Sequence, residues 1–266
     1  MNGSVGGAAA ILAVSLLTFT RTAASQEQPD DAWSINVGAG AMIRPDYEGS
    51  DDYEVRGLPI LGLNYRDIVI LRGPALMIDV VQLSGTGLAD HLSFGPLLEF
   101  DSGREANDNP VLRNLDDIDE GALAGVFFGY ELGPVELQLS VAQDATSRHE
   151  GLIAEIQAQY GVMLAQRLRA QLEISGSWSN DDYTQAYFGI TRAQARASGL
   201  REYTARAGVK DAGASLSLHY LMSEHWRLSG RFGYRRLLGD AADSPLVEDF
   251  GSANQASAAL FVSYQF

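Results

Sequence analysis

The stretch "RLRAQLEISGSW", residues 167–178, alternates apolar and polar side chains with a period of two. Successive side chains of a β-strand point to opposite faces, so this period predicts a strand with two different faces. One face carries Leu168, Ala170, Leu172, Ile174 and Trp178. The other carries Arg167, Arg169, Gln171, Glu173, Ser175 and Ser177. This strand is therefore expected to separate an apolar environment from a polar one.

The same alternation recurs along the chain, for example in "HWRLSGRFGYRR" at 225–236 and "SAALFVSYQF" at 257–266. Stretches of about ten residues with this period, separated by turn residues, are typical of membrane barrels. The strands are expected at 32–44, 53–65, 67–72, 75–83, 89–102, 120–132, 134–144, 151–163, 166–178, 206–222, 224–237 and 254–266.

A soluble β-sandwich also alternates, and it remains the alternative fold. The connections favour the barrel, because short turns at 65–67, 132–134, 164–166 and 222–224 alternate with long links at 103–119, 179–205 and 238–253. Short periplasmic turns, long outer loops and an even strand count characterise outer-membrane barrels. The sequence thus predicts an all-β fold, a transmembrane antiparallel β-barrel of about 12 strands lying in the lipid bilayer of a Gram-negative outer membrane.

The composition excludes some classes of function. The 266 residues include no cysteine, so neither disulfides nor thiolate metal sites can form. A net charge of -15 argues against binding to nucleic acid, whose phosphates are bound by Lys and Arg. The long links are acidic at 46–54, 108–120 and 239–249, but they lack the ligand spacing of a calcium loop. We therefore interpret them as solvated outer loops.

The N-terminal region has the pattern of an export signal. An apolar run at 8–20 is followed by small residues at Ala23 and Ser25 and then by a polar stretch. The run is too short for a membrane-anchoring helix, which is the alternative. We expect a cleaved signal peptide at 1–25 and a barrel domain at 26–266.

Large aromatic residues stand near the ends of the lipid-facing strands. Aromatic girdles mark the two interfaces of a membrane barrel. The residues expected there are Trp178, Trp226, Tyr234, Tyr264 and Phe266. The terminal Phe266 also resembles the signal by which the barrel-assembly machinery recognises its clients, which makes that machinery an expected partner.

Charged residues on the opposite strand faces should line the lumen. The expected charges are Arg167, Arg169, Arg227, Arg231 and Arg235 on the basic side, and Glu99, Asp101, Glu136, Glu155 and Glu173 on the acidic side. Buried charges must be paired, so this set could fill the lumen as a structural plug. The alternative is a pore whose charged rings select a solute.

No catalytic or cofactor-binding pattern emerges from the sequence. The four histidines are scattered, and His149 has no serine or second carboxylate convincingly placed beside it. Nucleophile-elbow, phosphate-loop and dinucleotide fingerprints are absent. We expect a protein that is not an enzyme and that holds no cofactor or metal.

Residues 181–249 resemble the MltA-interacting protein / OmpV family of outer-membrane proteins. The similar elements are "YFGIT" at 187–191, the stretch from Gln194 to Leu200, and "LGDAADSP" at 238–245. The N-terminal half is similar through "GAGAMIRPDYEGSDDYEV" and "LPILGLNYRD". The resemblance implies a scaffold that joins a periplasmic lytic transglycosylase to a peptidoglycan synthase. Other family members look like adhesins or porins, so a solute channel or an adhesin is the alternative.

Overall fold

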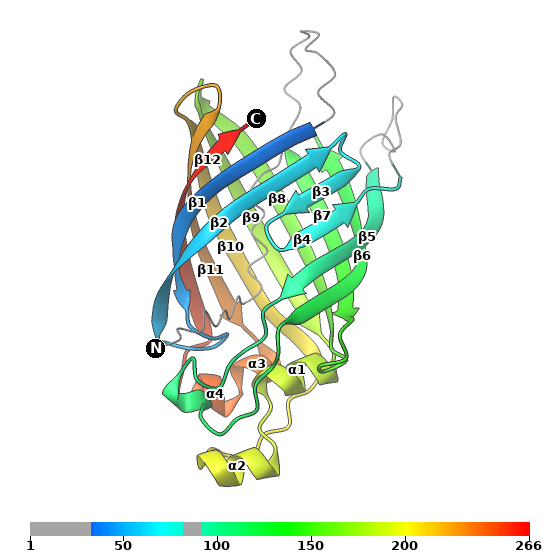
Figure 1. Ribbon diagram of the computed structural model, residues 1–266. Helices are drawn as coiled ribbons and strands as arrows, with labels where there is room; N and C mark the ends of the chain where they lie inside the picture. The colour runs from blue at the N-terminus through cyan, green and yellow to red at the C-terminus, as the bar shows by residue number, and fades with distance from the viewer. Residues whose placement is uncertain (1–32, 82–91) are drawn as a thin grey trace, which may run out of the picture.

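The computed structural model describes residues 33–81 and 92–266, which form a closed antiparallel barrel (Figure 1). Over these residues the barrel has twelve strands, as the alternation predicts. They are β1 (Trp33–Pro45), β2 (Tyr53–Tyr65), β3 (Val69–Arg72), β4 (Ala75–Ile78), β5 (Leu92–Asp101), β6 (Gly121–Leu132), β7 (Val135–Asp144), β8 (Leu152–Ala165), β9 (Leu168–Ser179), β10 (Gly208–Leu221), β11 (Trp226–Leu237) and β12 (Asn254–Gln265). The barrel fold is confirmed, and the sandwich alternative is wrong.

Each strand pairs with its neighbour in sequence, and β12 closes the ring by pairing with β1. The turns β2–β3, β6–β7, β8–β9 and β10–β11 lie together with the C-terminus at one end, and the links 46–52, 102–120, 145–151, 180–207 and 238–253 lie at the other (Figure 1). We call these the periplasmic end and the outer end, following the arrangement of outer-membrane barrels.

The strand register agrees with the expected faces. On β9, Leu172 points outward and is 52% exposed, whereas its neighbour Gln171 points inward and is 4% exposed. Leu216 of β10 lies opposite Leu172, so adjacent strands place apolar side chains on the same outer face. A shift of one residue would reverse both faces, and the apolar outer surface therefore fixes this register.

The strand bounds differ from the expected ones mainly around the short hairpin of β3 and β4. β4 ends at Ile78 rather than at 83, because Asp79 accepts hydrogen bonds from the backbone N–H groups of Val81 and Phe94. The expected strand residues at 82–83 and 89–91, and the signal peptide at 1–25, lie outside the described residues.

The outer loops contain four short α-helices and one 3-10 turn, none of which we expected. They are η2 (Pro110–Leu112), α1 (Asp181–Phe188), α2 (Arg192–Ser198), α3 (Gly239–Ala242) and α4 (Pro245–Glu248). Asn180 caps α1 by accepting from the N–H of Tyr183, and Thr191 caps α2 in a capping box with Gln194. Among the described residues, no helix has the length and apolar character needed to cross a membrane.

An apolar core fills the outer half of the barrel. Tyr183, Tyr187 and Phe188 of α1 are buried in one cluster with inward side chains of the barrel wall. Those wall residues are Met77, Leu97, Leu123, Phe127, Ala142 and Ile153. Because α1 packs its aromatic residues inside the strands, the loop that carries it closes the outer mouth.

Candidate functional site: the charged lumen and its outer closure

An ion pair in the lumen joins two of the charges that the sequence singles out. Arg231 of β11 and Glu173 of β9 are joined by an Nη2 to Oε1 contact of 2.8 Å, and both side chains are buried. Their strands are separated only by β10, whose Ser215 hydroxyl lies 3.5 Å from the same carboxylate oxygen. This group bridges three strands across the lumen face.

A second charged group lies at the bulge near the start of β10. The register of β10 against β9 shifts between Val209 and Asp211, and the extra residue, Lys210, is therefore buried beside Asp211 instead of pointing to lipid. Lys210 Nζ contacts Glu48 at 2.6 Å and Asp211 at 3.1 Å. Arg235 Nε contacts the same aspartate at 3.5 Å. Strict alternation could not reveal this group, because a bulge breaks the period of two.

The remaining expected charges occupy other parts of the lumen. Glu99 and Glu155 line a cavity of about 50 Å³ together with Arg72 of the short hairpin. Glu136 and Arg169 line a cavity of about 10 Å³ nearer the periplasmic end. Arg227 donates from Nη2 to Gln265 at 3.2 Å. The expected lumen position is wrong for Arg167, which is exposed in the turn before β9 because the strand starts at Leu168, two residues after its expected start.

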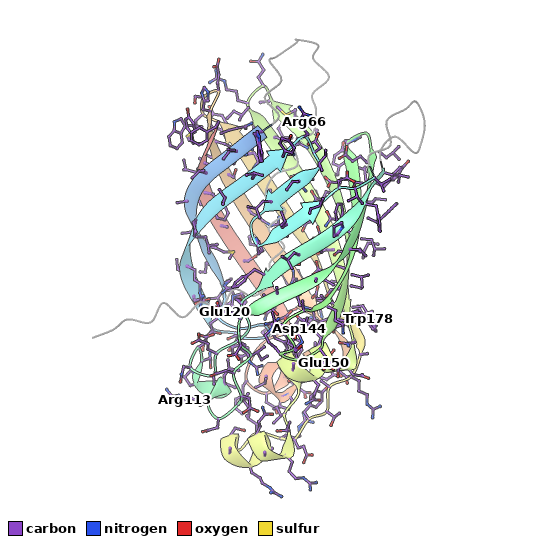
Figure 2. The ribbon with its side chains drawn as sticks, turned by 45° about the vertical axis from the view of Figure 1, so that its right-hand side comes forward. Arg66, Arg113, Glu120, Asp144, Glu150 and Trp178 are labelled. Atoms are coloured by element: carbon purple, nitrogen blue, oxygen red, sulfur yellow. The ribbon has the colours of Figure 1, made fainter. Side chains whose placement is uncertain are left out.

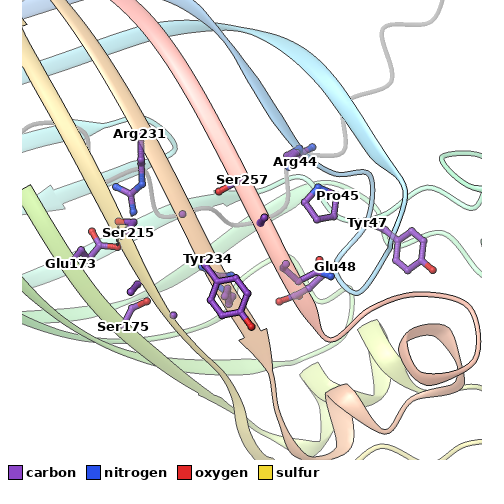
Figure 3. A pocket seen from close by; sticks show the side chains of 16 residues that line it. Arg44, Pro45, Tyr47, Glu48, Glu173, Ser175, Ser215, Arg231, Tyr234 and Ser257 are labelled. Carbon is purple, nitrogen blue, oxygen red and sulfur yellow. Dashed lines mark hydrogen bonds and ion pairs between the residues drawn. The ribbon is translucent and has the colours of Figure 1, made fainter.

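The largest of these lumen spaces is a cavity of about 80 Å³ on the periplasmic side of the outer closure (Figure 3). Figure 3 shows Arg231 extending toward Glu173, with Arg44 and Glu48 on the other side of the cavity. The polar and charged lining residues are Arg44, Glu48, Glu173, Ser175, Ser215, Arg231, Arg235, Gln255 and Ser257. A space of this size, lined in part by charged side chains, has room for several water molecules.

Asp101, at the outer end of β5, connects the barrel wall to the outer loops. Its Oδ2 accepts hydrogen bonds from the Tyr187 hydroxyl at 2.8 Å and from Arg148 Nη2 at 3.1 Å, and its Oδ1 accepts from the N–H of Gly103. Only 2% of Asp101 is exposed. The sequence indicated a lumen charge here, but not its partner Arg148, which comes from an outer loop.

Arg148 is held in place from several directions. Asp144 accepts from the Arg148 side chain at 3.2 Å and from the N–H groups of Thr146, Arg148 and His149, and the Asp119 carbonyl accepts from Arg148 Nη1. Burial alone would lower the pKa of Arg148, but the nearby Asp101 carboxylate outweighs it and raises that pKa above its usual value. Arg148 is therefore a fixed cation that connects three outer segments.

The aromatic residues of α1 complete the closure. Tyr183 and Tyr187 stack with ring centroids 4.6 Å apart, and the ring of His149 lies edge-on to both. Burial raises the pKa of Tyr183 and Tyr187 well above the usual tyrosine range. Both phenols stay neutral at physiological pH, which suits rings packed in an apolar cluster.

The five aromatic residues expected at the membrane interfaces lie near the two ends of the strands. Trp178 and Tyr234 are exposed on the outer face near the loops, and Figure 2 shows Trp178 at that level. At the periplasmic end, Tyr264 packs edge-on against Trp226 and Phe266. The Phe266 N–H also donates to the Ile35 carbonyl at 3.0 Å, which extends the pairing of β12 with β1.

Within the described residues, the charged side chains of the lumen and its closure meet in ion pairs. In the described ranges, no group of three or more His, Asp or Glu residues is placed to hold a metal ion. His149 Nδ1 accepts from the N–H of Gly151, and its ring is packed against tyrosines rather than beside a nucleophile. The interior is thus held in place by ion pairs and hydrogen bonds between the barrel wall and the outer loops.

Comparison with known proteins places this barrel in a family. The family described as "MltA-interacting protein MipA" matches residues 37–266. YiaT of Escherichia coli strain K12 is 26% identical over 242 residues, which cover 90% of this chain and 92% of YiaT. The MltA-interacting protein of the same strain is 23% identical over 236 residues, which cover 88% of this chain and 92% of that protein. Among solved structures, the COG4313 outer membrane channel from Pseudomonas putida F1 is similar with a TM-score of 0.44 and 15% identity, covering 91% of this chain and 100% of the channel. Since the family match spans most of its length, the chain belongs to the MltA-interacting protein (MipA) family.

Proposed function

We propose that this outer-membrane barrel is a non-enzymatic scaffold that holds a periplasmic lytic transglycosylase and brings it to a peptidoglycan synthase. The observation that carries the proposal is the closed outer mouth. Tyr183, Tyr187 and Phe188 are buried between wall side chains, and the Tyr187 hydroxyl donates to Asp101 at the end of β5. Asp101 also pairs with Arg148 of the neighbouring loop 145–151. A barrel closed in this way is suited to presenting surfaces at its ends rather than to passing solutes.

The name of the E. coli relative, MltA-interacting protein, supports the same direction, because it describes binding to another protein. At the periplasmic end, the turn between β8 and β9 lies against the turn between β10 and β11, where the Leu221 N–H donates to the Arg167 carbonyl at 2.8 Å. Leu164, next to the end of β8, and Met222, in the turn after β10, expose apolar side chains there. Exposed apolar groups beside charged ones are typical of protein contact surfaces.

The test measures binding of the purified barrel, in detergent, to the purified lytic transglycosylase of the same organism. Leu164→Glu together with Met222→Glu should weaken binding about tenfold, because most interface side chains contribute less than about 1 kcal/mol each and a combined loss of about 1.4 kcal/mol is tenfold. Phe250→Glu is the matched control, since Phe250 is a similarly exposed apolar residue in an outer loop. A ternary complex with the synthase tests the second half of the scaffold role.

Planar-bilayer recording separates the scaffold from its rival, a solute channel. The scaffold predicts no steady conductance for the intact protein, and a variant lacking α1 should conduct if that helix closes the mouth. Stable conductance of the intact protein contradicts the proposal. Equal transglycosylase binding by the intact protein, the Leu164/Met222 double variant and the Phe250→Glu control also contradicts it.

A further inference from the structure

One outer loop differs in charge from the rest of the outer surface. Residues 190–207, which we call the basic loop, contain four arginines and one glutamate, a net charge of +3 in a chain whose net charge is -15. The neighbouring acidic loops, 46–52 and 238–253, each hold four carboxylates and no Lys or Arg. Loop 102–120 holds six carboxylates and two arginines. The basic loop thus holds four of the seven arginines in the links at the outer end, and the first part of the same link, 180–189, carries Asp181 and Asp182.

The basic loop is a built structure rather than a loose connection. Thr191 and Gln194 form the capping box of α2, and Gly199 ends the helix with a left-handed φ of 81°. Ile190 and Tyr203 then pair through two backbone hydrogen bonds of 2.8 and 2.9 Å. Ala195 and Leu200 pack on the apolar cluster of Tyr47, Leu112, Leu115, Ile190 and Leu246. Its arginines are thus presented on a rigid support.

These arginines are accessible and only weakly neutralised. Among the described residues the loop forms two ion pairs, Arg192 with Glu202 and Arg201 with Glu248, both at 3.3 Å and with all four side chains more than half exposed. Such surface pairs contribute little free energy, so either arginine can turn to another anion. Arg196 follows Arg192 by one helical turn, which places two like charges on one exposed face. The two positive charges repel each other, and an external anion bound between them would relieve this repulsion.

The position of the loop indicates which anion it can reach. Figure 1 shows α2 as the described helix farthest from the strands, beyond α1, α3 and α4. It therefore lies past the girdle at Trp178 and Tyr234, where the lipid headgroups begin. In a Gram-negative outer membrane this layer contains the core saccharides of lipopolysaccharide, which carry phosphate groups. Arginine binds phosphate through two parallel hydrogen bonds, and the acidic loops repel phosphate elsewhere.

We propose that the basic loop binds the phosphorylated core saccharide of lipopolysaccharide, through Arg192, Arg196, Arg201 and Arg206. This inference concerns the outer end and does not depend on the scaffold role at the periplasmic end. The contact would anchor the loop in the saccharide layer around the barrel. Its affinity should fall as the salt concentration rises, because the attraction acts between exposed charges.

The test uses the intact protein in detergent micelles and measures binding of phosphorylated lipopolysaccharide core oligosaccharide. Arg192→Gln together with Arg196→Gln should weaken binding roughly 5-fold, as expected for the loss of two exposed charge pairs. Arg66→Gln is the matched control, since Arg66 is an exposed arginine at the periplasmic end (Figure 2). Heat-modifiable gel mobility verifies that each variant keeps the barrel.

A second arm uses the same oligosaccharide after enzymatic removal of its phosphates. The proposal expects the wild-type protein to lose most of its binding in this arm. Equal binding of the two oligosaccharides, equal effects of the loop and Arg66 variants, or binding to a sulfated heparin fragment without binding to the core saccharide would each overturn it.

Discussion

Replacing Asp101 with asparagine should open the outer closure while leaving the barrel intact. The substitution removes the charge that faces Arg148, whose side chain is 8% exposed, but it keeps an oxygen that can accept from Tyr187. Removing one partner of a buried ion pair costs about 3–5 kcal/mol. Arg148 retains Asp144 at 3.2 Å, so the loss should lie at the lower end, about 3 kcal/mol.

This loss of stability should appear as local opening of the outer closure, because Asp101 connects the outer loops to the barrel wall. The strands themselves are held together by backbone hydrogen bonds, which the substitution does not touch. A change of about 3 kcal/mol raises the population of the open closure about 100-fold. Hydrogen exchange of the amides in α1 and in loop 145–151 measures that population, and bilayer conductance should rise in parallel. The matched control is Asp51→Asn, an exposed outer-loop carboxylate. Unchanged exchange in α1, or loss of the whole barrel with the closure, would refute the reasoning.

Three further perturbations test other parts of the molecule. Leu172→Arg places a cation on the lipid face and should make folding into lipid vesicles less favourable by about 2–4 kcal/mol. Ser175→Arg, at a residue that lines the lumen cavity, should cost less than half as much. Burial raises the pKa of Tyr47 to about 12. The Tyr47 hydroxyl therefore loses its proton near pH 10 in the unfolded chain and only near pH 12 in the folded protein. The free energy of unfolding should fall by about 2–3 kcal/mol as the pH rises from 10 to 12. Unfolding curves at alkaline pH should show a smaller fall for Tyr47→Phe. Phe266→Ala should refold normally in detergent, by gel mobility, yet reach the outer membrane poorly in cells; normal abundance in cells would show that the ring is a rim contact alone.

The strands could be predicted from the sequence because the rule that forms them is local. A barrel wall between lipid and a polar lumen demands alternation at every strand, and the segment around Leu172 shows it without interruption. Errors occur where the rule is interrupted. Arg167 falls in a turn, and the bulge at Lys210 turns a residue of outward parity into the lumen.

The closure could not be predicted in the same way, since it depends on contacts between distant segments. Asp101 and Arg148 are 47 residues apart, and neither local charge nor periodicity indicates that they meet. A partial signal existed, however. Asn180 is a good helix cap, and Tyr183 and Tyr187 follow at helical spacing, so a short helix with an aromatic face could have been recognised inside the long link at 179–205.

Charges are paired tightly in the interior of this barrel and only loosely at its outer end. This difference explains why the two ends, rather than the lumen, should bind partners. Inside the lumen and closure, cations such as Arg231 and Lys210 contact buried carboxylates, and separating them would leave a buried charge without its partner. That interior is therefore costly to rearrange. At the outer end the arginines of the basic loop are loosely paired on a rigid support, and at the periplasmic end Leu164 and Met222 are exposed. Because a stiff wall separates these two surfaces, binding at one end need not disturb the other, and a family member can change either surface without refolding the barrel.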